Sequence, residues 1–104
     1  MKTKTINKQI KMIKSKFVNT YDFVFNNKII AQMEKTDEKF KGTNEYHLKF
    51  WSGYGFQNQD IWTGYTETKN MMIELLLKQI HNNEIIVNEH PNINEYYNNI
   101  KSIN

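Results

Sequence analysis

The sequence predicts an α+β fold in which a small antiparallel sheet of three to five strands packs against one main helix, with amphipathic N- and C-terminal helices. Hydrophobic residues have helical spacing in residues 6–17, a period of two in residues 21–65 and helical spacing again from residue 66. The length of 104 residues allows one domain, residues 1–104. Aromatic residues make up 13% of the chain, which supplies enough bulky side chains for a core. A folded globule is therefore expected.

Residues 1–17 are predicted to form a basic amphipathic helix. The apolar residues of this segment follow one another at steps of four, three and four, as on one helix face: Ile6, Ile10, Ile13 and Phe17. The lysines are Lys4, Lys8, Lys11 and Lys14, which lie off this stripe, and Lys16. Two interpretations stay open. The stripe packs on the sheet and the lysines are only solvated, or the lysines form a basic face that binds a partner.

Residues 18–66 are predicted to form the antiparallel strands. A three-residue hairpin loop at residues 26–28 places six apolar side chains on one face: Tyr21, Phe23, Phe25, Ile29, Ala31 and Met33. Asn26 and Asn27 suit this loop because Asn tolerates the left-handed backbone conformation. A third strand is predicted at residues 45–51, in which Trp51 faces away from the apolar side chains. A fourth strand is predicted at residues 61–65.

The main helix is predicted over residues 67–81, with Thr66 or Thr68 as its N-cap. Apolar residues surround this helix except for a narrow polar edge. Such a helix has to be covered on more than one side, by the sheet and by either the N-terminal helix or a second subunit. A homodimer is therefore predicted.

Residues 84–104 are predicted to form a short edge strand, at residues 84–89, and a C-terminal amphipathic helix. Pro91 suits the first helical position, and Asn92 with Glu95 resembles a capping box.

Composition excludes several classes of site. The chain has no Cys, so disulfides, zinc ribbons and thiol nucleophiles are excluded. No stretch approaches eighteen apolar residues, and the N-terminal segment lacks the apolar core of a signal peptide, so a cytoplasmic location and no membrane partner are expected. His81, Glu84, Glu89 and His90 cluster after the main helix but are not expected to bind a metal; His81 is interpreted as a helix-end residue and His90 as a loop or cap residue. We expect no enzymatic activity, no cofactor and no metal.

Charge is unevenly distributed along the chain. Residues 1–16 hold six Lys and no acidic residue, whereas residues 52–104 hold three Lys and six acidic residues. This dipolar layout suits contact with phosphates or with an acidic partner surface. All 14 basic residues are Lys, and the abundant Lys, Asn and Ile have AT-rich codons, which indicates an AT-rich bacterium, a virus or a mobile element as the source.

Residues 53–56, Gly-Tyr-Gly-Phe, resemble the centre of the first ribonucleoprotein motif of RNA-recognition-motif domains. The resemblance implies that Tyr54 and Phe56 stack on bases and that residues 23–25 serve as the companion motif. It also implies a helix within residues 28–40 and a last strand at residues 84–88.

Two classes of function follow. The first is a small non-enzymatic binding protein, an inhibitor made by a phage or mobile element against a host protein or nucleoprotein complex that handles nucleic acid in defence. Such a protein is similar in kind to anti-CRISPR-type proteins. Its anchors would be the aromatic residues outside the predicted core face, Trp51, Tyr54, Phe56 and Trp62. The alternative is that a terminal helix covers this second face of the sheet.

The second class is a Lys-based DNA- or RNA-binding domain with weak sequence preference. It would use Lys4, Lys8, Lys11, Lys14 and Lys16 together with the same aromatic residues. The absence of Arg favours the first class, because Arg supplies the bidentate fork that reads guanine.

Overall fold

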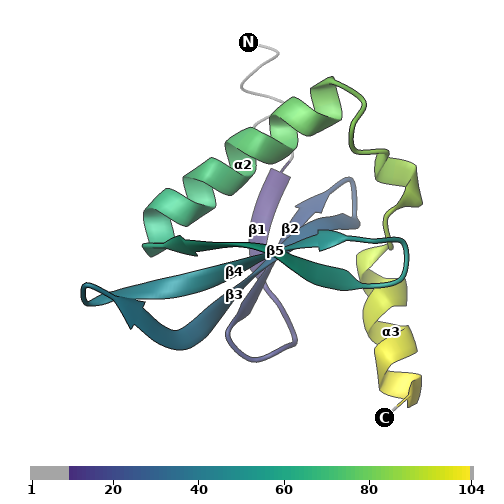
Figure 1. Cartoon of the computed structure of the whole chain (residues 1–104). Coiled ribbons are helices and arrows are strands. Elements are labelled where there is room, and N and C mark those ends of the chain that lie inside the picture. Colours follow the sequence, from purple (N-terminus) through teal and green to yellow (C-terminus); the bar gives the residue numbers. More distant parts are fainter. Residues whose placement is uncertain (1–9, 104) are drawn as a thin grey trace.

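A five-stranded antiparallel sheet carries one helix on each of its faces (Figure 1). The computed structural model describes residues 10–103, and the side chains of residues 10–100. The strands lie side by side in chain order: β1 (Ile10–Lys14), β2 (Thr20–Phe25), β3 (Lys28–Phe40), β4 (Thr43–Trp51) and β5 (Phe56–Thr63). The helices are α2 (Tyr65–His81), the short 3-10 helix η1 (Val87–Glu89) and α3 (Ile93–Ile103).

The predicted N-terminal helix is wrong in the part of it that the structure describes. β1 is an edge strand that pairs with β2, with Met12 opposite Phe23. Ile10 is buried and Met12 is half-buried, both packed against the core. Ile10 and Met12 alternate inward as in a strand, and β-branched Ile favours strands, whereas Ile13 leaves the other face and is 38% exposed. The predicted fold, with its N-terminal helix beside one main helix, is therefore corrected to five strands with α2 and α3; Ile6, Lys4 and Lys8 lie outside the described residues.

The hairpin between β2 and β3 has a two-residue turn instead of the predicted three-residue loop. Asn26 and Asn27 both have positive φ, 51° and 65°, as in a type I′ turn. A register shift then restores the inward face: Phe23 pairs with Ala31, but Val24 pairs with Ile29, so Ile30 is an extra residue. This bulge keeps Ala31 on the same face as Phe23 and turns Ile29 to the other face, contrary to the prediction.

α2 runs across one face of the sheet, which we call the α2 face (Figure 1). The helix begins at Tyr65, earlier than predicted, because Gly64 takes the N-cap position with a φ of 85° that a residue with a side chain rarely adopts. No side chain caps this end; the predicted cap Thr68 is buried inside the helix instead. The core combines Met72 and Leu76 of α2 with side chains from the strands, among them Phe23, Ala31, Met33 and Leu48.

The edge strand predicted at residues 84–89 is a loop that contains η1. The chain then returns to the start of β3, where the Ile29 amide donates to the Pro91 carbonyl at 2.9 Å. α3 starts at Ile93, and the side chain of Asn92 accepts the Asn94 amide at 2.9 Å, so Asn92 caps the helix as the sequence predicts. The predicted place of Pro91 as the first helical residue is wrong, because Pro91 precedes this cap.

Candidate functional site

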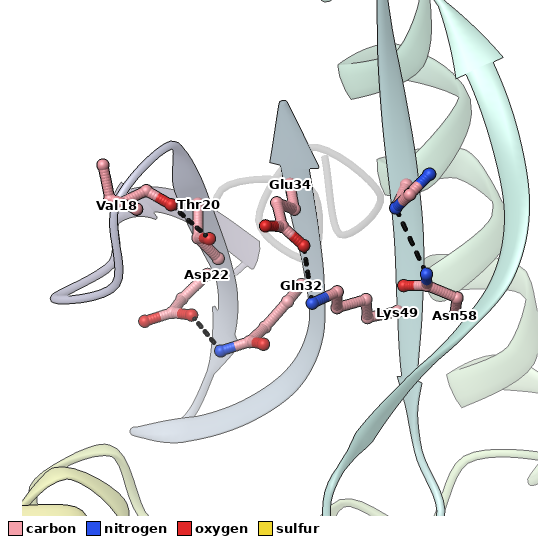
Figure 2. Close-up of polar contacts among 8 residues, drawn as sticks. Val18, Thr20, Asp22, Gln32, Glu34, Lys49 and Asn58 are labelled. Carbon is pink, nitrogen blue, oxygen red and sulfur yellow. Dashed lines mark hydrogen bonds and ion pairs between the residues drawn. The ribbon is translucent and has the colours of Figure 1, made fainter. Parts of the chain in front are cut away.

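The face of the sheet opposite α2 carries polar side chains that pair across the strands (Figure 2). Gln32 on β3 donates from Nε2 to Oδ1 of Asp22 on β2, at 2.9 Å. Glu34 on β3 forms an ion pair with Lys49 on β4, with 2.7 Å between Nζ and Oε1. We call this surface the α3 face, because α3 covers part of it.

A buried hydrogen-bond network around Asp22 holds α3 against the sheet. Tyr97 of α3 donates its hydroxyl hydrogen to Asp22. The Ser15 hydroxyl lies 2.7 Å from the Tyr97 oxygen, and Ser15 is the donor because the Tyr97 hydrogen is already used. Asp22 is completely buried, and no Lys in the described part of the chain forms an ion pair with it. The network therefore joins β2, the turn after β1 and α3 by hydrogen bonds alone.

Burial sets the protonation behaviour of this network. It raises the pKa of the Asp22 carboxyl, and the hydrogen bonds from Tyr97 and Gln32 oppose that shift only in part. Burial, followed by the hydrogen bond to Asp22, also raises the pKa of Tyr97 far above its usual range. The Tyr97 hydroxyl therefore keeps its hydrogen at neutral pH and remains a donor to Asp22.

We expect Asp22 to make the free energy of unfolding depend on pH. A carboxyl whose pKa is higher in the folded than in the unfolded state stabilises the fold fully below its ordinary pKa of 3.8, and this stabilisation is lost as the pH rises through the raised folded value. The free energy of unfolding of the wild type, minus that of Asp22→Asn, should therefore decrease from acidic to neutral pH. Urea unfolding of both proteins across this pH range measures the difference, and a difference that increases with pH would contradict the expectation.

Aromatic side chains form a connected row over the α3 face. The ring centroids of Trp51 and Phe56 are 4.9 Å apart, and those of Phe56 and Tyr96 are 5.5 Å apart with the planes at 83°. Tyr96 also packs against Phe17 at 6.3 Å and against Tyr97 at 5.2 Å. These edge-to-face contacts fix Tyr96 in the middle of the row.

Tyr54 projects from the turn between β4 and β5. The turn is closed beneath it, because the Ser52 amide and hydroxyl both donate to the Gly55 carbonyl oxygen, at 2.9 and 3.0 Å. Tyr54 is 97% exposed, although it lies next to the half-buried rings of the row. We call Tyr54 and the outer rings of the row the aromatic surface: Phe17, Trp51, Tyr54, Phe56 and Tyr96.

Two grooves flank Tyr96 on this surface. One, of about 350 Å³, lies between the β4–β5 turn and α3 and is lined by residues that include Trp51, Tyr54 and Glu95. The other, of about 370 Å³, is lined by residues that include Phe17 and the ion pair of Glu34 and Lys49. The aromatic surface is therefore hollowed on both sides of a fixed ring.

The structure brings three of the four predicted aromatic anchors together: Trp51, Tyr54 and Phe56. Trp62 is separate from them, because it lies on the α2 face opposite Tyr46, half-buried against the core. Its indole Nε1 donates to the Asp60 carboxylate at 3.3 Å. Trp62 is therefore removed from the candidate site.

The predicted basic face is not present in the part of the chain that the structure describes. Lys11 and Lys14 are three residues apart on β1, so their side chains leave opposite faces of the strand. The Lys14 ammonium lies 5.4 Å from the ring centre of Tyr21, and the Lys16 ammonium lies 5.3 Å from that of Tyr97. Lys14 and Lys16 thus each have an aromatic neighbour, and these neighbours lie on different faces of the sheet.

Sequence reasoning missed Phe17, Tyr96 and Glu95 as site residues. Helical spacing places Phe17 in a buried stripe. In the C-terminal helix, either Tyr96 or Tyr97 can complete an apolar stripe with Ile93 and Ile100, so spacing does not say which of the two is buried. Among residues 93–100 of α3, whose side chains the structure describes, only Tyr97 is buried, because it reaches Asp22. Its neighbour Tyr96 turns to the aromatic row. Adjacent residues of a helix point in different directions, so a helix that buries one narrow face buries only one of two neighbouring Tyr. The Tyr-Tyr pair is therefore the sequence signal that one of the two rings lies at a surface.

The resemblance to RNA-recognition-motif domains is limited to residues 53–56. Residues 28–40, where that family has a helix, form β3, and residues 84–88, where it has a strand, form a loop and part of η1. Tyr54 lies in a turn between strands rather than on a strand.

No known protein family matches the chain, and neither a curated protein nor a solved structure is significantly similar to it. Within residues 10–103, no three His, Asp or Glu side chains lie close enough together to hold a metal ion. Over the same residues, no helix has both the length and the apolar composition needed to cross a membrane.

Proposed function

We propose that the chain is a small non-enzymatic binding protein that docks on a protein partner through the aromatic surface. The observation that carries this proposal is Tyr54, which is almost fully exposed on a closed turn beside Trp51 and Phe56. Packing does not account for an aromatic side chain in this position, whereas Tyr and Trp are frequent anchors in protein interfaces. Phe17 and Val18, 39% and 78% exposed, extend the apolar area across the α3 face.

The layout of this area matches a protein interface. Aromatic side chains form its centre, and charged side chains lie beside them: Glu95 in one groove and the ion pair of Glu34 and Lys49 in the other. A nucleic-acid strand stacked on Tyr54 would instead bring phosphates close to Glu95. The carboxylates therefore favour a protein partner.

We propose further that the protein is an inhibitor encoded by a phage or another mobile element. It would act in the cytoplasm on a host protein or nucleoprotein complex that handles nucleic acid, in the manner of anti-CRISPR-type proteins. The small size and the AT-rich coding bias support this proposal. The anchors are Trp51, Tyr54 and Phe56.

A homodimer remains a prediction. The large apolar residues in the middle of α2, Met71, Met72, Ile73, Leu75, Leu76 and Leu77, are buried or half-buried within one chain. A second copy that packed on α2 would therefore bury apolar side chains that the chain itself already covers in part.

The alternative function, a Lys-based nucleic-acid-binding domain, predicts a strong salt dependence. Binding through phosphates makes log affinity for duplex DNA fall with log salt at a slope of about 0.9 per contact, and removing three contacts flattens that slope by roughly 2–3 units. We expect the purified protein to show no tight, salt-steep binding to labelled DNA or RNA in fluorescence anisotropy titrations.

The matched variants are a triple Lys→Gln change at Lys11, Lys14 and Lys16 and the same change at Lys35, Lys39 and Lys41, in the β3–β4 hairpin. Nucleic-acid binding that is tight, is lost in the first variant, is kept in the second and is unaffected by Tyr54→Ala would favour the nucleic-acid-binding function over the protein-binding one.

A further inference from the structure

The groove between the β4–β5 turn and α3 has the composition of a cation-binding pocket. Three aromatic side chains line it, Trp51 from the end of β4, Tyr54 from the turn and Tyr96 from α3. Glu95, adjacent to Tyr96 on α3, adds a carboxylate, and Ile100 contributes apolar surface one helical turn further on. Its volume of about 350 Å³ is near the lower end of ligand pockets, which suits a single long side chain.

The rings are arranged around this space rather than stacked on one another. The planes of Trp51 and Tyr96 are 79° apart, with the ring centroids separated by 6.5 Å. Because the two rings are nearly perpendicular, their π faces point in different directions. A cation gains attraction from each ring face that it approaches within about 6 Å, and Trp is the strongest of the aromatic partners.

Charge in the groove has one sign. Among the residues that line it, Glu95 is the only one with a formal charge. The adjoining groove, which shares Trp51, is lined by one residue with a formal charge at pH 7, and it is again acidic: Glu84. His90 also lines that groove and counts as neutral. The backbone of Lys28 pairs with that of Asn92, close to the start of α3. The Lys28 side chain, however, lies on the α2 face, because Lys28 is paired with Phe25 of β2. The groove therefore favours a positive ligand group and disfavours a phosphate or carboxylate.

We propose that this groove binds an Arg side chain of the protein partner. This inference rests on the proposed function and specifies the chemistry of the partner. A guanidinium is planar, so it stacks on the Trp51 or Tyr54 ring while its N–H groups donate to the Glu95 carboxylate. A Lys ammonium fits the same charge but lacks the flat face and the fork, so it binds more weakly. The chain itself contains no Arg, so this group has to come from the partner.

The test uses the tripeptide Gly-Arg-Gly and the full chain. Binding is followed by the NMR resonance of the Trp51 indole N–H, and the Trp62 indole on the α2 face serves as an internal reference. The matched ligand is Gly-citrulline-Gly, which has the shape of Arg without its charge. We expect Gly-Arg-Gly to shift Trp51 saturably and to bind about tenfold more tightly than the citrulline peptide, with Trp62 unaffected.

Two variants separate charge from packing. Glu95→Gln should weaken Gly-Arg-Gly binding by roughly three- to tenfold and should change the affinity for the neutral citrulline peptide less, because that peptide lacks the charge-assisted part of the interaction. Glu38→Gln, an exposed carboxylate on the distant part of β3, should change neither. Equal affinities for the two peptides, no effect of Glu95→Gln, or no shift of Trp51 at the highest soluble peptide concentration would each overturn the inference.

Failure of the Arg inference can be distinguished from failure of the proposed function. If Tyr54→Ala releases a protein partner but the groove does not prefer Arg over citrulline, the aromatic surface is an interface and only the Arg inference fails. If the groove prefers Arg but Tyr54→Ala leaves partner binding unchanged, the groove binds cations and the proposed function fails.

Discussion

Leu76→Ala is expected to lower the free energy of unfolding by roughly 2–5 kcal/mol. Leu76 is fully buried in the middle of α2, where it packs with Met72 against the sheet, so truncation leaves a cavity that the surrounding strands can fill only in part. Urea unfolding followed by circular dichroism measures the change.

The matched control is Lys78→Ala, two residues further along the same helix and exposed. It should change the free energy of unfolding by less than about 0.5 kcal/mol. Equal, small changes in both variants would mean that the buried face of α2 is placed wrongly.

Tyr54→Ala is expected to weaken binding of the protein partner by about 2 kcal/mol or more, roughly a thirtyfold increase in Kd. It should leave the free energy of unfolding almost unchanged, because Tyr54 is exposed and its turn is closed by Ser52 and Gly55. Tyr54 is a better probe than Trp51 for this reason, since Trp51→Ala would also remove contacts to Phe56 and Tyr96. Calorimetric titration with the purified partner measures the effect.

Phe40→Ala is the control for Tyr54→Ala. Phe40 is also an exposed aromatic residue, 55% exposed. It lies at the opposite end of β4 from Tyr54, because it pairs with Thr43, the first residue of that strand, whereas Tyr54 comes after the last one. Its removal should leave the affinity unchanged. Similar losses in both variants would indicate that exposed aromatic area in general, and not the aromatic surface, governs binding.

Local pattern predicted the parts of the structure that local interactions decide. The period of two identified residues of β2, β3 and β4, and the cap at Asn92 was predicted from the residue types at its helix start. The segment 10–14 could not be assigned in the same way, because Ile10 and Ile13 have the spacing of a helix face whereas Ile10 and Met12 have that of a strand face. Pairing with β2, a tertiary interaction, selects the strand.

The β2–β3 hairpin shows a second limit of sequence reasoning. A two-residue turn at Asn26 and Asn27 looks incompatible with Phe23 and Ala31 on one face, because it shifts the alternation by one residue. The bulge at Ile30 corrects the shift, and a bulge has no clear signal in a single sequence.

Much of the candidate site depends on contacts between distant segments. Trp51, Tyr54 and Phe56 are neighbours in sequence, so their role as a group could be predicted. Tyr96 joins them only because α3 docks on the sheet, and that docking uses a hydrogen bond between Tyr97 and Asp22, 75 residues apart. Asp22 alternates with apolar residues on β2, a position that predicts a solvent-facing carboxylate rather than a buried one.

Affinity capture from a host lysate tests most directly whether the aromatic surface binds a protein. The baits are the wild type, Tyr54→Ala and Phe40→Ala, each used with and without nuclease, and captured proteins are quantified by mass spectrometry. We predict a set of proteins that resists nuclease, is retained equally by the wild type and Phe40→Ala, and is lost from Tyr54→Ala. Release of all captured proteins by nuclease, or equal capture by Tyr54→Ala, would contradict the proposal that this surface is a protein-binding site.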